Sequence, residues 1–246
     1  MRRFLLPFVF VGLCAYAVAR APRAALVVAA ACALVGVALA ALLPRWLARR
    51  RLHAIIEAGD VRELLRAWYR SAAGLANPET TIPLMIATAY ASFGWVDEAR
   101  RAREAIRPGA ALGSSREQVE FVDVLLQVYD GDREEAVRRA EALLERVVPD
   151  GDSVLDRRAT AFRRGLVAVA RAFAHRATTD DAAALVAMRE PVPILTWPLR
   201  YAEAVVALDA GDGARAARLL EQAPKWPESS VFATFHRELA GLVRAR

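Results

Sequence analysis

The chain has 246 residues, 56% of them hydrophobic, and its 34 basic and 28 acidic residues give a formal net charge of +6. Residues 1–51 contain eight arginines and no acidic residue, which leaves 26 basic and 28 acidic residues, a net charge of −2, for residues 52–246. A general basic surface for nucleic acid is therefore excluded. Both cysteines, Cys14 and Cys32, also lie near the N-terminus, which excludes a disulfide framework or a cysteine zinc site downstream.

Two apolar runs at the N-terminus predict a transmembrane hairpin over residues 1–44. Residues 24–43 contain no charged residue and are about as long as a helix that crosses a bilayer. The run 4–19 is shorter and has Pro7 near its start, where a helix tolerates proline. We expect spans at about 4–19 and 24–43, joined by the short polar turn 20–23.

A cleaved signal peptide is the alternative for the first run, because Ala17-Val-Ala19 before Arg20 has the small-x-small form of a cleavage site. A lipoprotein signal fits less well, because Leu13 before Cys14 is large. In either case the chain after residue 44 lies on the same side of the membrane.

The arginines predict which side that is. With both chain termini in the cytoplasm, six of the eight N-terminal arginines lie inside, and with the reverse orientation only two do. Abundant alanine and a single lysine, Lys225, are typical of a GC-rich bacterium, so we expect a bacterial inner-membrane protein with a cytoplasmic domain. The residues that set this topology, and that are candidates for contacts with lipid headgroups, are Arg45, Arg49, Arg50 and Arg51.

Small residues recur at three- and four-residue spacing along the second span, and such a seam packs membrane helices closely. We expect it to pack the two spans together, with homo-oligomer formation as the alternative. The seam comprises Ala25, Ala29, Ala33, Gly36 and Ala40.

Residues 45–246 predict an all-α domain, because apolar positions recur at helical spacing and no strand pattern is found. The stretches 57–68, 129–140 and 209–220 each contain Gly-Asp followed by an amphipathic helix start. The positions five residues after the turn glycines are Leu64, Ala99, Ala136 and Ala216, at intervals of 35, 37 and 80 residues.

The long interval indicates a further unit, in which Asp180-Asp181-Ala182 matches the acidic pair and small residue of the others and Ala177 replaces the glycine. Five helix-turn-helix units then cover about 46–244. An α-solenoid is expected, because a single hairpin of this size cannot bury its own apolar face.

The unit over residues 83–108 resembles a tetratricopeptide repeat (TPR). Ile86, Ala87 and Tyr90 match the large-small-aromatic order of the first helix of that motif. Gly94 is its turn glycine, and 97–99 its acidic pair and small residue. The chain departs from the motif where Pro83 replaces tryptophan and Arg103 an aromatic residue, and the other four units are degenerate.

The resemblance implies that a protein partner binds the inner face, which the first helix of each unit lines. The carboxylate-binding Lys/Asn/Arg set of some TPR proteins is absent, which argues against binding of a C-terminal tail. The groove positions carried over from the family are Met85, Thr88, Phe121, Leu125, Tyr129, Arg164, Arg171, His175, Tyr201 and Val205.

Basic residues at spacings of seven, seven and four predict one polar face of a single helix, formed by Arg157, Arg164, Arg171 and His175. One interpretation is a solvated helix face. The other is an anchor for an acidic segment of the partner, because arginine pairs well with carboxylates.

No catalytic or metal motif is found, and the three histidines His53, His175 and His236 are far apart. We therefore expect a membrane-tethered scaffold or adaptor with no catalysis and no cofactor. One alternative is an accessory or regulatory subunit of a membrane enzyme or transporter complex. The other is a periplasmic assembly factor, if the topology is reversed.

Overall fold

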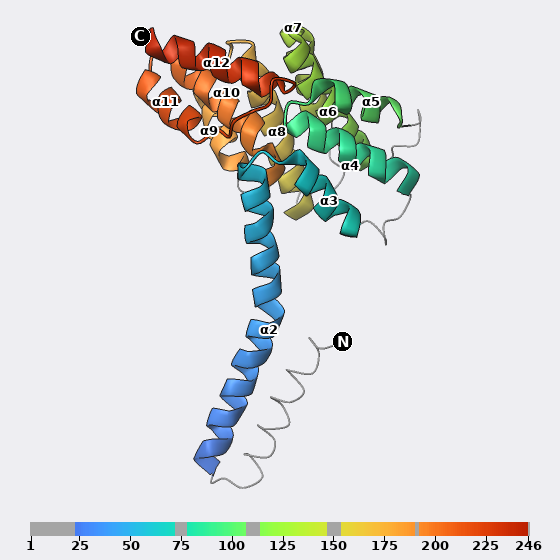
Figure 1. Cartoon of the computed structure of the whole chain (residues 1–246), viewed down its shortest axis with the longest axis vertical. Coiled ribbons are helices and arrows are strands. Elements are labelled where there is room, and N and C mark those ends of the chain that lie inside the picture. Colours follow the sequence, from blue (N-terminus) through green and yellow to red (C-terminus); the bar gives the residue numbers. More distant parts are fainter. Residues whose placement is uncertain (1–22, 72–77, 107–113, 147–153, 190–191, 246) are drawn as a thin grey trace. The chain divides into compact units, whose positions relative to one another are not determined.

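The computed structural model describes residues 23–71, 78–106, 114–146, 154–189 and 192–245 (Figure 1). Within these ranges the chain forms eleven α-helices and one 3-10 turn, without any strand, so the all-α prediction is confirmed. The chain divides into two compact units, Met1–Ala54 and Ile55–Arg246.

The first unit contains most of helix α2 (Arg23–Glu57). Alanine and leucine dominate its sequence and favour the helix, which continues through Pro44 although proline cannot donate a backbone hydrogen bond there. Large apolar side chains that are 49–72% exposed follow one another along it: Leu34, Val35, Val37, Leu39, Leu42, Leu43, Trp46 and Leu47.

Within the described residues one helix is long and apolar enough to cross a membrane, over Ala31–Glu57. The other predicted span, 4–19, lies outside the described residues, so the two-span hairpin stays a prediction. The predicted boundary between span and repeat domain at 44/45 does not coincide with a helix end. α2 continues to Glu57, and its residues Ile55 and Ile56 are buried in the second unit.

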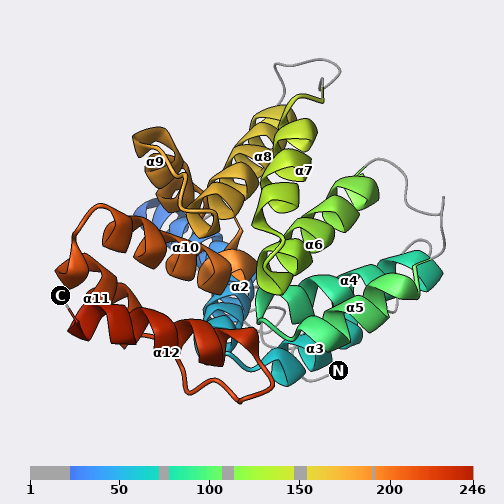
Figure 2. The ribbon, with the colours of Figure 1, turned by 90° about the horizontal axis from the view of Figure 1, so that it is seen from above.

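The second unit is built from helix pairs. Its elements are α3 (Val61–Ser71), α4 (Pro78–Ser92), α5 (Val96–Glu104), α6 (Ser114–Asp130), α7 (Arg133–Leu144), α8 (Val154–Phe173), α9 (Thr179–Met188), η2 (Pro193–Leu195), α10 (Thr196–Asp209), α11 (Gly213–Glu221) and α12 (Val231–Arg244). Helices α4 and α5, α6 and α7, α8 and α9, and α10 and α11 pack as pairs, and each of α4, α6 and α8 also packs on the first helix of the next pair (Figure 2).

The four turn glycines have the same backbone conformation at the corner of each pair. Their φ angles are positive, a region that glycine enters without the steric cost of a Cβ: Gly59 (71°), Gly94 (73°), Gly131 (87°) and Gly211 (79°). At three of these corners the next residue is an aspartate that caps the following helix. Oδ1 of Asp60, Asp132 and Asp212 accepts a hydrogen bond from the backbone N–H three residues later.

The corner between α8 and α9, which has no glycine, differs from the predicted one. The residue with positive φ is His175 (57°), not Ala177, and Thr178 caps α9. Two more residues therefore separate the turn from the cap than at the glycine corners. The predicted position of Ala182 holds, because its N–H donates to the cap carbonyl of Thr178 as the N–H of Ala216 donates to that of Asp212.

Small residues after the corners are fully buried, as close helix packing requires. Ala99, Ala136 and Ala216 are each 0% exposed, and so is Ala87 on the first helix of its pair. A larger side chain at these positions would force the two helices of a pair apart.

The segment 222–235, which we call the returning segment, runs back from the last helix pair to the corner between α4 and α5. The backbone N–H of Val231 donates to the carbonyl of Gly94 (2.8 Å), and Ser230 Oγ donates to the carbonyl of Phe93 (2.8 Å). Phe232 stacks on Tyr201 with ring centroids 4.9 Å apart and meets Tyr129 edge-on at 5.7 Å. The array of helices in this unit therefore closes on itself.

Candidate functional site

A cleft of about 240 Å³ opens where α4, α6 and α8 meet η2. It lies on the first helices of three successive pairs. Its walls are mainly apolar, and its lining comprises Thr88, Glu117, Gln118, Phe121, Phe162, Val192, Ile194 and Leu195.

The helices hold the apolar side of the cleft rigidly. Phe121 on α6 is 2% exposed and packs on Phe162 of α8, with ring centroids 5.5 Å apart. Pro193 begins η2 with a backbone already suited to a turn, and Thr196 Oγ1 donates to its carbonyl at 2.6 Å. This turn places Val192 and Ile194 at the rim, where both side chains are half-buried.

A short chain of hydrogen bonds forms the polar side. Gln118 Nε2 donates to Thr88 Oγ1 at 3.0 Å, and Thr88 Oγ1 donates to the carbonyl of Leu84 at 2.7 Å. These bonds leave the amide oxygen of Gln118 and its second N–H as further hydrogen-bonding groups.

Beside these hydrogen bonds, Glu117 accepts a hydrogen bond from Arg163. Arg163 is 6% exposed and also donates to the carbonyl of Arg146 at 2.7 Å. A buried pair of this kind is costly to disrupt, because removing one partner leaves a charge without compensation. The pair therefore maintains the α6–α8 contact below the cleft.

The structure brings two of the predicted groove residues, Thr88 and Phe121, together in this cleft. Met85 lies instead in a small apolar pocket between α3 and α4. The other apolar and aromatic groove residues are at most 9% exposed and pack inside the chain's own core: Leu125, Tyr129, Tyr201 and Val205. Thr88 and Phe121 are equally buried, at 5% and 2% exposed, but they line the cleft, whereas Tyr129 and Tyr201 pack against Phe232.

Tyr129 and Tyr201 lie in this core, and burial changes the acidity of their hydroxyl groups. Burial raises the pKa of Tyr129 well above its ordinary value, and its hydroxyl has no hydrogen-bond partner among the described residues. Burial also raises the pKa of Tyr201, although a hydrogen bond from Trp226 Nε1 (2.8 Å) opposes the shift.

The predicted basic face of α8 does not form as one surface. Arg157 and Arg164 are exposed on α8, but α8 ends at Phe173, and His175 lies beyond it in the corner. His175 Nδ1 lies 3.0 Å from Oδ1 of Asp209 at the end of α10. The expectation that His175 continues the helix face was therefore wrong, because the chain turns one residue earlier.

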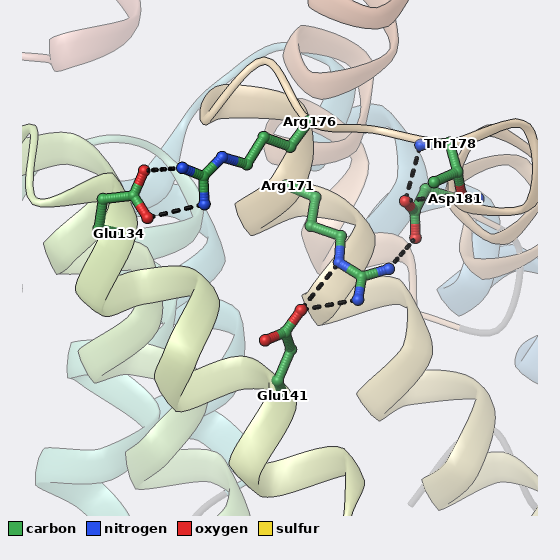
Figure 3. A network of polar contacts seen from close by, with 6 residues as sticks. All are labelled: Glu134, Glu141, Arg171, Arg176, Thr178 and Asp181. Atoms are coloured by element: carbon green, nitrogen blue, oxygen red, sulfur yellow. Dashed lines mark hydrogen bonds and ion pairs between the residues drawn. The ribbon is translucent and has the colours of Figure 1, made fainter.

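Arg171 is already paired within the chain (Figure 3). Its Nη2 donates to Glu141 Oε1 of α7 at 2.7 Å, and Nη1 donates to Asp181 Oδ1 of α9 at 3.5 Å. The hydrogen bond to Glu141 is the main cause that raises the pKa of Arg171, against a smaller lowering by burial. Arg176 forms a neighbouring pair with Glu134.

Asp181 joins this network to the cap of α9. Its Oδ2 accepts hydrogen bonds from the backbone N–H and the Oγ1 of Thr178, and its own N–H donates back to Thr178 Oγ1. This is a reciprocal capping arrangement, and the spacing Thr178-x-x-Asp181 in the sequence is the signal for it. The network holds α7, α8 and α9 together.

Sequence reasoning missed most of the cleft. Phe162 of α8 and the residues of η2 are not among the predicted groove positions. Glu117 and Gln118 follow Ser114 and Ser115 at the spacing of a capping box, which indicates a helix start and not a cleft. Val192, Ile194 and Leu195 reach the cleft through η2, outside the first helices that the TPR resemblance indicates.

In the first unit, Arg49, Arg50 and Arg51 are exposed on α2, and the guanidinium of Arg50 lies 4.3 Å from the ring centroid of Trp46. The side chain of Arg45 lies outside the described residues. Tryptophan beside arginines at the end of an apolar stretch is typical of the membrane–water interface.

No family model, no curated protein and no solved structure matches this chain. Among the described residues, histidine, cysteine, aspartate and glutamate form no group of three or more that could hold a metal ion. The resemblance to TPR proteins therefore rests on the residues of the unit 83–108, such as Ala87, Tyr90 and Gly94.

Proposed function

We propose that the chain is a membrane-tethered interaction protein of a bacterial inner membrane. In this proposal α2 is the anchor and the unit Ile55–Arg246 is a cytoplasmic TPR-like array that binds a partner protein. The exposed apolar surface of α2 and the arginines around it support the anchor. The packing of successive first helices supports the TPR-like array.

The observation that carries the binding function is the cleft of about 240 Å³ between α4, α6, α8 and η2. Apolar walls with a few placed polar groups are typical of binding sites, since burial supplies affinity and hydrogen bonds orient the ligand. Phe121 and Phe162 form the apolar wall, and Gln118 is the polar group. The chemistry suits an apolar side chain of the partner whose backbone hydrogen-bonds to Gln118.

A partner with an acidic segment would meet fewer arginines than the sequence suggested. Arg171 is engaged by Glu141 and Asp181, which leaves the exposed Arg157 and Arg164 as the candidates for such a contact. Glutamate in place of both would weaken partner binding if an acidic segment docks there. Unchanged binding would remove the acidic segment from the proposal and leave the cleft.

The cleft is tested by substitutions at its rim in the full chain, produced in its own membrane. Ile194→Arg and Phe162→Ala should reduce the amount of partner that co-purifies, because they fill or flatten the apolar wall. Val186→Arg is the matched control, since Val186 is 50% exposed on α9 and does not line the cleft. Equal recovery of the partner with all three variants, at equal thermal stability, would contradict the proposal.

The topology is tested by reporters fused after Arg246. A reporter that fluoresces in the cytoplasm should be active, and one that requires export should be inactive. The reverse result would place the second unit in the periplasm and favour an assembly factor there.

A second candidate, an accessory subunit of a membrane complex, is favoured by the small residues of α2. Ala33 and Gly36 are less exposed than the leucines and valines around them, so a neighbouring membrane helix could approach them closely. Gly36→Leu should then abolish assembly while the cleft variants leave it intact. The opposite pattern supports the interaction protein proposed above.

A further inference from the structure

Basic residues are concentrated in the part of the chain that follows the predicted span. Residues 45–71 contain seven arginines and three acidic residues, a net charge of +4, whereas residues 72–246 contain 23 basic and 25 acidic residues, a net charge of −2. Four of the seven arginines were assigned above to topology. The other three, Arg62, Arg66 and Arg70, belong to helix α3 of the second unit.

Helix α3 presents these arginines on one exposed face. Val61, Leu64 and Leu65 are at most 9% exposed and face the core of the unit. Arg62, Arg66 and Arg70 follow one another at four-residue spacing, which places them along the opposite side of the helix, and all three are exposed.

An exposed aromatic side chain accompanies them. Tyr69 is 50% exposed, and it lines a small apolar pocket between α3 and α4 together with Leu65, Trp68 and Met85 among others. Arginines beside an exposed tyrosine and an apolar pocket form the pattern of a helix that lies in a membrane interface: the apolar groups enter the headgroup region and the guanidinium groups bind phosphates.

Four acidic residues lie near this face in the chain, and each has an interaction within the protein. Asp60 is engaged as the cap of α3, and Glu57 lies 3.9 Å from Arg200. Glu63 is on α3 itself, and Glu79 is exposed near the start of α4. A purely solvated helix face has no need of an exposed tyrosine at an apolar pocket.

We propose that the exposed face of α3, formed by Arg62, Arg66, Tyr69 and Arg70, binds an anionic lipid surface. In the sequence, α3 begins only ten residues after Arg51, so the face follows directly on the arginines assigned to topology. The proposal rests on α2 as the membrane anchor and is independent of the cleft. The face orients the second unit on the bilayer through electrostatic attraction and burial of Tyr69.

The test uses the full chain in vesicles of phosphatidylcholine, with or without about one-third phosphatidylglycerol. Cys14→Ser and Cys32→Ser remove the native thiols, and an environment-sensitive nitrobenzoxadiazole label is attached through Leu39→Cys, Tyr69→Cys or Val186→Cys in separate proteins. Leu39 reports the anchor, Tyr69 the α3 face, and Val186 an exposed apolar position on α9 that serves as the control.

We expect the label at residue 69 to shift to the blue and to be quenched by spin-labelled lipid in the anionic vesicles. High salt, or Arg62→Gln, Arg66→Gln and Arg70→Gln together, should remove both changes. The label at residue 186 should stay in water in every vesicle.

Two results would overturn the proposal, and they differ in what else they affect. If label 39 is quenched by lipid and label 69 behaves as label 186 does, the anchor stands and the α3 surface fails. If label 39 also remains in water, the anchor fails, and with it both the α3 surface and the membrane part of the proposed function. A blue shift at residue 69 that is equal in both kinds of vesicle would contradict the role of the arginines.

Discussion

The corners at Gly59 and Gly94 differ from those at Gly131 and Gly211 in what packs against them. A Cβ at Gly94 would lie 2.8 Å from Ser230 Oγ and 3.0 Å from Val231 Cγ1, and at Gly59 it would lie 2.8 Å from Pro224 Cγ. At Gly131 and Gly211 a Cβ would meet no atom of the described residues within 4 Å, apart from those of its chain neighbours.

The turn glycine therefore has two roles in this chain. At the open corners glycine is needed only for its positive φ. At the covered corners it also provides the space into which the returning segment 222–235 packs. The corners at Gly59 and Gly94 thus differ from those at Gly131 and Gly211 by contacts with residues more than 100 positions away in the chain. The following substitutions test that difference.

The largest effect is expected from Phe232→Ala. Phe232 belongs to the returning segment and is 0% exposed. Its ring contacts Tyr129, Tyr201 and Trp226. Loss of a fully buried aromatic ring should lower the free energy of unfolding by about 4 kcal/mol, measured by denaturant titration of the full chain in detergent. Leu242→Ala on the same helix is the control, because Leu242 is 53% exposed and its loss should cost less than about 0.5 kcal/mol. Equal losses would mean that the segment does not dock.

Gly94→Ala and Gly131→Ala compare a covered corner with an open one. Both impose a Cβ on a positive φ, which costs about 1 kcal/mol, and this should be the whole effect at Gly131. At Gly94 the contacts with Ser230 and Val231 should raise the loss to about 3 kcal/mol. The measurement is the difference between the two variants in unfolding free energy. Equal losses in the two variants would show that the returning segment accommodates the added methyl group at residue 94 without a loss of stability.

The open corner at Gly211 should depend on its cap. Asp212 Oδ1 accepts the N–H of Arg215 at 2.9 Å, so Asp212→Ala should destabilise the fold by about 1 kcal/mol. Asp212→Asn keeps an acceptor at the same position and should retain most of the stability. A loss as large with asparagine as with alanine would assign the effect to the charge of Asp212 and not to its hydrogen bond.

The smallest effect at neutral pH is expected from Tyr129→Phe, within about 1 kcal/mol of zero, because the buried hydroxyl has no partner among the described residues. At alkaline pH the two proteins should separate. Burial raises the folded-state pKa of Tyr129 above the ordinary value of about 10, so the unfolded chain loses its proton first and stability falls as pH rises above about 10. Thermal melts between neutral and alkaline pH should show a smaller fall for Tyr129→Phe. An identical fall would mean that water reaches this hydroxyl.

The corners show how far prediction from sequence extends. The positions of the helix pairs, the glycine turns and the aspartate caps follow from short-range patterns, because each depends on residues within one turn of helix. The turn between α8 and α9 was predicted at Ala177 but lies two residues earlier, because His175 adopts the positive φ although it is not glycine. Only the hydrogen bonds around Thr178 and the contact with Asp209 locate it.

The candidate site was predicted less well for a related reason. Groove positions carried over from the TPR resemblance include Tyr129 and Tyr201, which the sequence marks as first-helix residues like Thr88 and Phe121. Their burial depends on Phe232, a residue of α12 that no local pattern connects with them. In the same way, Arg171 has the spacing of a free basic face but is neutralised by Glu141 from another helix pair.

The amino-acid sequence by itself determined that the chain after α2 is built from short helices joined at glycine corners, because helical periodicity, glycine conformation and aspartate capping act between near neighbours. It also determined that the positive charge gathers beside the apolar N-terminal segment. Only the tertiary structure decided which first-helix residues line the cleft and which pack against the segment 222–235. That outcome depends on where the segment 222–235 packs, and such packing is a sum of many weak contacts between residues far apart in the chain.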